Sequence, residues 1–423
     1  MGNQPPGIIK DSMFYRFSLY GFLKNLRFFD PFIILIFSSY GLSFLQIGLL
    51  YSIRDIATNL LELPTGILAD SFGRRKAMIA AFVAYIASFM ILYFIRDFWF
   101  LSLAMILFAF GEAARSGTHK ALILEYLKIN KISDLKIAYY GLTRSASQFG
   151  SAINALIAAG LVFYTGSYRI MFLASVIPYT LDLINLISYP EELDGEITYV
   201  KGDAVWINMK TTLKNLYQVM KNSGVQRILF NSASFTAVFK SSKDYLQPIL
   251  SFLALSLVLN ADLENIHKEA LVIGAVYFVI YLLTSLASRQ AYAVSNRFRS
   301  ITKPVNLTYL LGAGLLLISG VMVALEWEML AVIGFIGLYL LNNIRRPINV
   351  GIISDQIQSN VMASGLSTEA QLTTIFSALF APLIGYLIDS LGLGNGISLM
   401  GLVMLFLYFF VRVQDPKKIP VRN

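Results

Sequence analysis

Apolar stretches of about twenty residues alternate with short polar segments along almost the whole chain. A stretch of that length spans the hydrocarbon core of a bilayer as an α-helix. The pattern predicts an all-α integral membrane protein with twelve transmembrane helices in two sets of six. The predicted helices cover residues 18–40, 44–70, 76–96, 98–127, 136–163 and 167–190, and then 226–257, 269–289, 304–325, 329–352, 368–390 and 396–413.

The longest polar segment separates the two sets and predicts the domain organisation. We expect an N-terminal six-helix bundle over residues 1–190, a cytoplasmic linker over 191–225 and a C-terminal six-helix bundle over 226–423. Within the linker, apolar residues from Trp206 to Met220 recur at helical spacing among lysines. This is typical of an amphipathic helix on the membrane surface. A helix that joins the two halves is favoured over a docking site for a regulatory partner.

Composition supports the membrane assignment and excludes several classes. Of the 423 residues, 56% are hydrophobic and 14% charged, whereas soluble proteins carry about 25% charged residues. The chain has no cysteine and two histidines, which excludes disulfides and disfavours a transition-metal site. The motifs of hydrolases, metalloproteases and phosphate-binding loops are absent from the sequence. We therefore predict no enzyme, no cofactor, no bound metal and no nucleic-acid partner.

The positions of the lysines and arginines predict the orientation in the membrane. If the N-terminus is cytoplasmic, the cytoplasmic segments hold 21 of the 34 cations and the external loops hold three. Positive charge is enriched on the cytoplasmic side of membrane proteins. We expect a multi-pass monomer in the lipid bilayer of the cell membrane, with both termini in the cytoplasm.

The other ten cations lie within the predicted helices, where a charge costs about 3 kcal/mol or more unless it meets water or a partner. They are Lys24, Arg27, Arg54, Arg115, Lys120, Arg144, Lys240, Lys243, Arg345 and Arg346. The acids in the predicted helices are Asp30, Asp55, Glu62, Glu112, Asp182 and Asp244. This excess of positive charge predicts a polar cavity for a small solute, with a preference for anionic or zwitterionic organic molecules.

Several polar residues repeat at helical spacing and therefore share one face of their helix. Guanidinium groups suit carboxylate and phosphate. The candidate substrate-binding residues are Arg54, Arg115, His119, Arg144, Gln148, Lys240, Asp244, Asn342, Arg345 and Arg346. For any single acid and its neighbouring cation, such as Glu112 and Arg115, a purely structural ion pair is an equally good interpretation. For His119, a hydrogen-bonded structural role is favoured over a proton relay.

Proton coupling would need a carboxyl group that burial brings into the working range of pH. Asp30, which precedes Pro31, and Glu112 are the first candidates, and Asp55 and Glu62 come second. A coupling ion other than the proton stays open.

The two halves carry traces of a duplication. The segment Arg115–Glu125 (RSGTHKALILE) aligns with Arg345–Asp355 (RRPINVGIISD) at the same ten-residue spacing from cation to acid. The fourth and tenth predicted helices therefore correspond.

The segment Leu63–Lys76, LPTGILADSFGRRK, resembles the loop between helices 2 and 3 of the major facilitator superfamily (MFS). The resemblance implies two pseudo-symmetric six-helix bundles and secondary active transport by alternating access. Its gating residues would be Gly66, Asp70, Gly73, Arg74 and Arg75. It implies that Gly66 permits close helix packing, that Gly73 permits a tight turn, and that Asp70 contacts the N-terminus of the helix near Ser367. For the arginines, a purely topogenic role is equally favoured.

The direction of transport stays open. The Gly-Pro-x-x-Gly-Gly run of MFS antiporters is missing from Gln148–Gly160, QFGSAINALIAAG, which argues against drug–proton antiport. The leading prediction is a proton-coupled secondary transporter for an anionic or zwitterionic solute. The alternatives are a multidrug or amphiphile efflux pump, a lipid flippase and, less favoured, a membrane sensor that binds without transport.

Overall fold

A computed structural model describes residues 10–195, 223–257, 263–296, 302–356 and 362–414. These ranges contain helices and short connections and no strand. Nine helical segments within them are long and apolar enough to cross a membrane. The all-helical membrane fold is thus confirmed, and the count of twelve helices stays a prediction. The amphipathic helix expected between Trp206 and Met220 lies outside the described residues.

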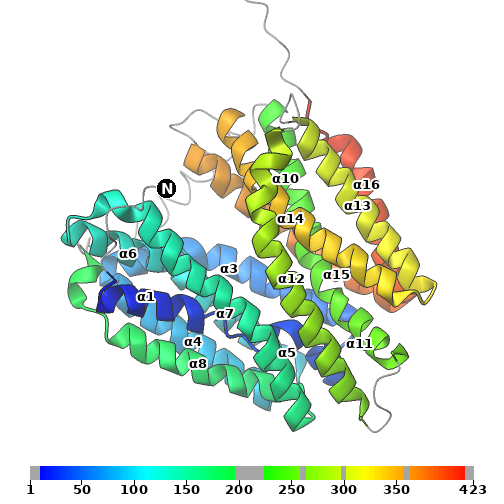
Figure 1. The fold of residues 1–423 in the computed structure, drawn as a ribbon, viewed down its shortest axis with the longest axis horizontal. Helices are drawn as coiled ribbons and strands as arrows, with labels where there is room; N and C mark the ends of the chain where they lie inside the picture. Colours follow the sequence, from blue (N-terminus) through cyan, green and yellow to red (C-terminus); the bar gives the residue numbers. More distant parts are fainter. Residues whose placement is uncertain (1–9, 196–222, 258–262, 297–301, 357–361, 415–423) are drawn as a thin grey trace, which may run out of the picture. The chain divides into compact units, whose positions relative to one another are not determined.

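Figure 1 shows the helices in chain order. In the first half they are α1 (Ser12–Leu23), η1 (Asp30–Phe32), α2 (Ile33–Ser39), α3 (Phe44–Phe72), α4 (Arg74–Phe94), α5 (Phe98–Arg115), α6 (Thr118–Ile129), η2 (Ser133–Leu135), α7 (Lys136–Thr165), α8 (Ile170–Ile187) and η3 (Glu191–Asp194). In the second half they are α10 (Ser223–Ser242), η4 (Lys243–Tyr245), α11 (Leu246–Ser256), α12 (Asn265–Asn296), α13 (Thr302–Ala324), α14 (Glu328–Gln356), α15 (Met362–Leu391) and α16 (Leu393–Val411).

The chain forms two compact units. Unit 1 comprises Met1–Leu42, Ile53–Ile207 and Ala254–Tyr281, and unit 2 comprises Ser43–Ser52, Asn208–Leu253 and Leu282–Asn423. The start of α3 thus belongs to unit 2, and the first half of α12 belongs to unit 1. The domain boundaries expected at residues 190 and 226 stay a prediction.

Small residues let the helices of unit 1 pack closely. Helix α1 lies against α7, and α4 packs on α5 and α8 (Figure 1). A Cβ added at Gly150 would lie 2.6 Å from the carbonyl oxygen of Phe22, and one at Gly21 would lie 2.7 Å from Ser147 Oγ. Larger residues at these glycines would push α1 away from α7, as expected where membrane helices pack through small residues.

Unit 2 is built around the α10–α15 and α13–α16 pairs. In this unit the C-terminal part of α15 holds the first turn of α3. Asp389 accepts hydrogen bonds from the backbone amides of Phe44 at 3.0 Å and Leu45 at 2.8 Å. A carboxylate at a helix N-terminus satisfies free amides and the positive end of the helix dipole. A Cβ at Gly48 would lie 2.2 Å from the carbonyl oxygen of Ala381, so α3 and α15 are in close contact there.

The helix predicted over residues 18–40 is wrong as a continuous helix. Helix α1 ends at Leu23, and helical structure resumes at Asp30. The cause lies partly in Pro31, which has no amide hydrogen and is favoured in the first turn of a helix. In the structure it follows Asp30 at the start of η1.

Two further predicted helices are also interrupted. The helix expected over 98–127 ends at Arg115 and restarts at Thr118, because Gly117 adopts a φ of +75°, which glycine accommodates easily. The helix expected over 226–257 contains the 3-10 turn η4. All three interruptions lie at or beside intramembrane charges.

Candidate functional site

The break in α1 exposes backbone groups that side chains of unit 1 satisfy. Tyr179 donates to the carbonyl oxygen of Lys24 at 2.9 Å, and Asn154 donates to that of Arg27 at 3.0 Å. The amide of Phe28 donates to Ser175 Oγ at 3.0 Å. Broken membrane helices persist where neighbouring polar groups take over the lost hydrogen bonds. The interruption places the Arg27 side chain inside the unit.

Arg27 and Arg115 share one carboxylate, that of Glu112. Arg27 Nη2 pairs with Glu112 Oε1, and Arg115 Nη2 pairs with Oε2 at 2.8 Å. The hydroxyl of Tyr85 donates to Oε1 at 2.6 Å. The guanidinium of Arg27 also lies over the ring of Phe108, 4.9 Å from its centroid. These are the contacts of the structural ion-pair interpretation, and the roles predicted for Glu112 in coupling and for Arg115 in substrate binding stay predictions.

His119 lies in an aromatic setting in the same unit. Its ring stacks on Tyr20 with centroids 3.6 Å apart, and Nε2 is 3.4 Å from the hydroxyl of Tyr189. Phe17 meets the imidazole edge to face at 5.5 Å. This arrangement fits the packed, hydrogen-bonded role that the sequence favoured for His119.

The other candidates of unit 1 have contacts of their own. Arg54 pairs with the adjacent Asp55 at 2.9 Å, and Glu62 accepts a hydrogen bond from Ser116 at 3.0 Å. Two more candidates, Arg144 and Gln148, are exposed on α7, and Asp30 opens η1. The proton-coupling roles of Asp30, Asp55 and Glu62 stay predictions.

The GRRK segment forms the turn that its glycine predicts. Gly73 has a φ of +103°, and Asp194 of η3 accepts a hydrogen bond from the Arg75 amide at 2.6 Å. Arg75 pairs with Glu191 at 2.5 Å. The turn is thus held to the segment after α8.

The remaining residues of the motif are less constrained within unit 1. Arg74 lies 3.7 Å from Asp70 and 3.8 Å from Glu125. The side chain of Asp70 is 59% exposed, and a Cβ at Gly66 would have no atom within 4 Å. The gating roles of Asp70 and Gly66 stay predictions.

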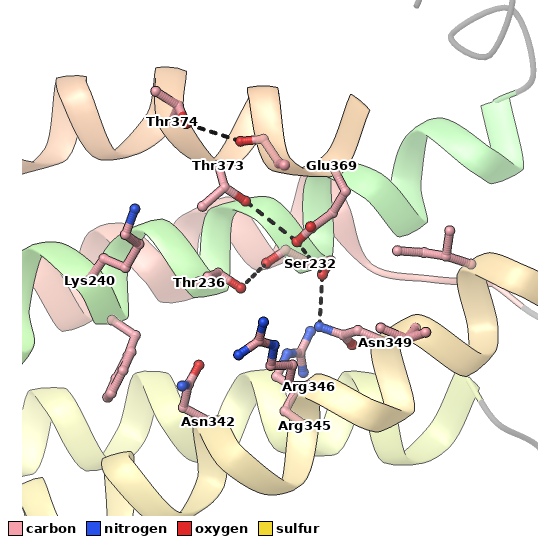
Figure 2. Close-up of a pocket in the computed structure, with 14 residues that line it drawn as sticks. Ser232, Thr236, Lys240, Asn342, Arg345, Arg346, Asn349, Glu369, Thr373 and Thr374 are labelled. Atoms are coloured by element: carbon pink, nitrogen blue, oxygen red, sulfur yellow. Dashed lines mark hydrogen bonds between the residues drawn. The ribbon is translucent and has the colours of Figure 1, made fainter. Parts of the chain in front are cut away.

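Unit 2 contains a cavity of about 560 Å³ between α10, α14 and α15 (Figure 2). Its volume lies within the 300–1,000 Å³ or so that is usual for small-molecule sites. Four predicted substrate-binding residues line it: Lys240, Asn342, Arg345 and Arg346.

Among the described cations of unit 2, Arg345 is the most deeply buried, with 1% of its surface exposed. Its guanidinium donates to the carbonyl oxygen of Val305 at 2.5 Å, to Thr308 Oγ1 at 2.6 Å and to Asn231 Oδ1. It also lies 4.4 Å from the ring centroid of Phe235. Every one of these partners is uncharged. No carboxylate of the described residues lies within 4 Å of Arg345, so its positive charge has no direct counter-ion among them.

Glu369 of α15 is the acid of the cavity wall. It accepts hydrogen bonds from Ser232 at 2.9 Å and Thr373 at 3.4 Å. Asn349 in turn donates to Ser232 Oγ at 2.8 Å, which links α14 to the same chain of bonds (Figure 2). The adjacent Arg346 is exposed and forms no hydrogen bond to another described residue.

Asp244 belongs to a separate group in unit 2. It pairs with Lys243 at 2.5 Å, and the hydroxyl of Tyr51 lies 3.4 Å from its other oxygen. The turn η4 directs both charged residues toward each other, and Asp244 is absent from the cavity wall. The structure thus separates Asp244 from Lys240, with which the sequence grouped it.

The profile of the Major Facilitator Superfamily matches residues 17–368. The chain belongs to this superfamily. An MFS-type transporter of Bacillus subtilis (strain 168), YxaM, is 34% identical over 108 residues, 25% of this chain and 27% of that protein. The match therefore covers about a quarter of that relative.

Solved structures share the MFS fold. A nucleoside transporter, NupG, superposes with a TM-score of 0.76 and 12% identity over 95% of this chain and 98% of that one. A POT family transporter in complex with 5-aminolevulinic acid gives a TM-score of 0.70 and 14% identity over 96% of both chains. The protein is a multi-pass membrane protein with the fold of secondary transporters.

Sequence reasoning did not include Glu369 among the candidates of this MFS chain. The residue was close to the expected start of the eleventh helix at 368, where an acid is explained by the helix dipole. Helix α15 begins at Met362 instead, so Glu369 lies two turns inside it. The spacing of Glu369 and Thr373, four residues apart on one helical face, was the available signal.

Proposed function

We propose that this MFS transporter couples the movement of an anionic or zwitterionic organic solute to protons, and that the cavity of unit 2 binds the solute's acidic group. The observation that carries the proposal is the uneven charge of the cavity wall. Lys240, Arg345 and Arg346 line it, and Glu369 is the acid among the described lining residues.

The cations of the wall differ in what they can offer a solute. The Nη1 and Nη2 groups of Arg345 donate to uncharged acceptors, and its buried Nε has no hydrogen-bond partner among the described residues, so the side chain is held in place and contributes a fixed positive potential. Arg346 is exposed beside it and has free donors toward the cavity. A planar guanidinium binds a carboxylate or phosphate through two parallel hydrogen bonds. We assign the direct contact with the solute's anionic group to Arg346.

Glu369 provides the feature that distinguishes a zwitterion from a simple anion. Its carboxylate is held by two hydroxyl donors, Ser232 and Thr373, and by no cation of the described residues within 4 Å. An ammonium group could therefore pair with it while a carboxylate pairs with Arg346. A solute that carries both groups could pair with Glu369 and Arg346 at the same time.

The test is flux into liposomes that contain the purified full-length protein. Four probes represent the classes: succinate, alanylalanine, uridine and tetraphenylphosphonium. We expect accumulation of succinate or alanylalanine when an inward proton gradient is imposed, and none when the gradient is collapsed by a protonophore. The variant R412Q, which removes an exposed arginine at the end of α16, is the control for protein quality.

Two results would contradict the proposal. Transport of tetraphenylphosphonium alone would favour multidrug efflux. Accumulation that ignores the proton gradient would remove proton coupling and leave a carrier driven in another way.

A further inference from the structure

One buried carboxyl group of unit 1 takes no part in the Glu112 network. Asp182 lies on α8 with none of its surface exposed. Its Oδ1 accepts one hydrogen bond, from Asn185 at 3.2 Å. Its Oδ2 has no donor among the described residues. An ionised carboxylate here would keep one oxygen without compensation in an apolar interior, which is strongly unfavourable.

The other polar residues on this face of α8 bind the segment around α1. Ser175 accepts from the Phe28 amide, Tyr179 donates to the Lys24 carbonyl oxygen, and Asn185 donates to that of Arg16 at 3.1 Å. Asp182 shares their helical spacing. It is the member of the face that has no hydrogen bond to this segment in the described structure.

The ionisable groups that act electrostatically on Asp182 come from few elements. They are Tyr20 and Lys24 on or next to α1, Arg115 at the end of α5, and Tyr189 beyond α8. His119 of α6 stacks on Tyr20. Helices α4 and α7 also pack on α8, and within the described ranges they direct no charged group at Asp182.

Of the two cations in this group, Arg115 is already paired with Glu112. Lys24 lies 5.5 Å from the centroid of the Tyr20 ring and has no carboxylate within 4 Å among the described residues. It is partly exposed. Asp182 and Lys24 are thus an acid and a base, within electrostatic reach of each other, that lack a direct ionic contact.

We propose that Asp182 is a proton-binding site of the transporter and that Lys24 is the counter-ion of its ionised form. In the protonated state the carboxyl group is neutral, and Lys24 is free to contact water. On deprotonation the O–H bond breaks, its electron pair stays on the carboxylate, and the proton passes to water at the partly exposed end of Lys24. The ammonium group then closes on the carboxylate.

The position of Lys24 connects this step to the rest of unit 1. Lys24 directly follows the last residue of α1, at the start of the break that carries Arg27. A movement of Lys24 toward Asp182 therefore pulls on the segment that holds the Arg27–Glu112 contact. The inference rests on the proposed proton coupling and supplies the residue for it.

Glu112 is less suited to the same role. It already receives Arg27, Arg115 and Tyr85. A proton added to it would leave two guanidinium groups without their shared counter-ion. Asp182 has an open oxygen, and a proton there displaces no partner.

Infrared difference spectroscopy tests the inference without a transported solute. The reconstituted full-length protein is titrated with pH, and the carbonyl stretch of protonated carboxyl groups is followed. We expect a titrating band that is lost in D182N and retained in E192Q, which removes an exposed acid of unit 1. In K24Q the band should persist with its midpoint moved to higher pH, because the cation that stabilises the ionised form is gone.

A band that is unchanged in D182N, or the absence of any titrating band in the wild type, would overturn the inference. If D182N fails to fold, D182E replaces it, and a displaced band in that variant gives the same assignment. Failure here leaves the proposed function standing, since that proposal is tested by flux. Conversely, flux that ignores the proton gradient removes the coupling even if Asp182 titrates.

Discussion

Two arginines that the duplication places at equivalent positions have opposite surroundings. Arg115 of unit 1 has Glu112 three residues before it and pairs with its carboxylate at 2.8 Å. Arg345 of unit 2 has Asn342 at that position and donates instead to uncharged oxygens. Both are held in partly aromatic settings. In the predicted alignment of the two halves, the acid Glu112 thus corresponds to the amide Asn342.

The difference shows that similar sequence patterns in the two halves place an arginine in two different electrostatic settings. In unit 1 the carboxylate of Glu112 serves as a direct counter-ion for both arginines and leaves a net charge of +1 on the group. In unit 2 the positive charge has no such internal partner among the described residues, and a cavity lies beside it. Under the proposed function, a bound anion would supply there what Glu112 supplies in unit 1.

The largest effect is expected from removing the internal counter-ion of unit 1. In E112Q, Arg27 and Arg115 lose their shared carboxylate in a partly buried setting; breaking a fully buried ion pair on one side costs roughly 3 kcal/mol or more. Thermal unfolding in detergent should show a strongly lowered Tm. The matched control is E191Q, whose carboxylate is 78% exposed in its pair with Arg75. Equal Tm values for the two variants would contradict a structural role for Glu112.

A second variant introduces into unit 2 the acid that unit 1 has three residues before its arginine. In N342E a carboxylate enters the cavity wall three residues before Arg345 and should compete with a solute's anionic group. We expect binding of the preferred carboxylate probe to weaken about 30-fold, or about 2 kcal/mol. N343E is the control, because Asn343 lies outside the cavity wall and bonds to Tyr339. Undiminished binding in N342E would show that the cavity does not bind the anionic group.

Removing the exposed guanidinium should have a smaller effect on affinity. In R346Q we expect about a tenfold loss, near 1.4 kcal/mol, for probes that carry a carboxylate. Binding of uridine should not change, because it has no acidic group. Calorimetry on the wild type, R346Q and R412Q measures both. A loss of equal size in R412Q would show that only net charge matters.

The smallest effect concerns the contact between α15 and the start of α3. D389A removes the carboxylate that accepts from Phe44 and Leu45, and loss of such a cap costs about 1 kcal/mol. D389N keeps an acceptor and should lose only part of this. A modest, graded decrease in Tm is expected, and a D389A variant as stable as the wild type would show that the cap contributes nothing.

Hydropathy predicts much of this fold because a bilayer requires long apolar helices. It does not predict the breaks at Lys24–Phe29 and at Gly117, because the apolar pattern continues on both sides of each break. The break in α1 depends on Tyr179, Asn154 and Ser175, which are far away in the sequence. Pro31 and Gly117 were the local signals.

The sequence predicted the cations of the candidate site but not all of the residues around them. Arg345 and Arg346 follow from charge in an apolar helix. That Arg345 has uncharged partners could not be predicted, because Val305 and Thr308 come from α13 and Asn231 from α10. Asp182 was listed among the acids of the predicted helices, but only the packing of α8 on α1 shows that one of its oxygens has no donor among the described residues.

The most direct test of the central claim is thermal stabilisation of the wild type and N342E by succinate, alanylalanine, uridine and tetraphenylphosphonium. A ligand that binds the native state raises Tm by mass action. We predict that succinate or alanylalanine stabilises the wild type, that N342E loses this response, and that uridine and tetraphenylphosphonium have little effect on either. Stabilisation of the wild type by tetraphenylphosphonium alone, or an equal response of both proteins to the carboxylates, would contradict the claim that the cation-rich cavity wall of unit 2 binds the solute.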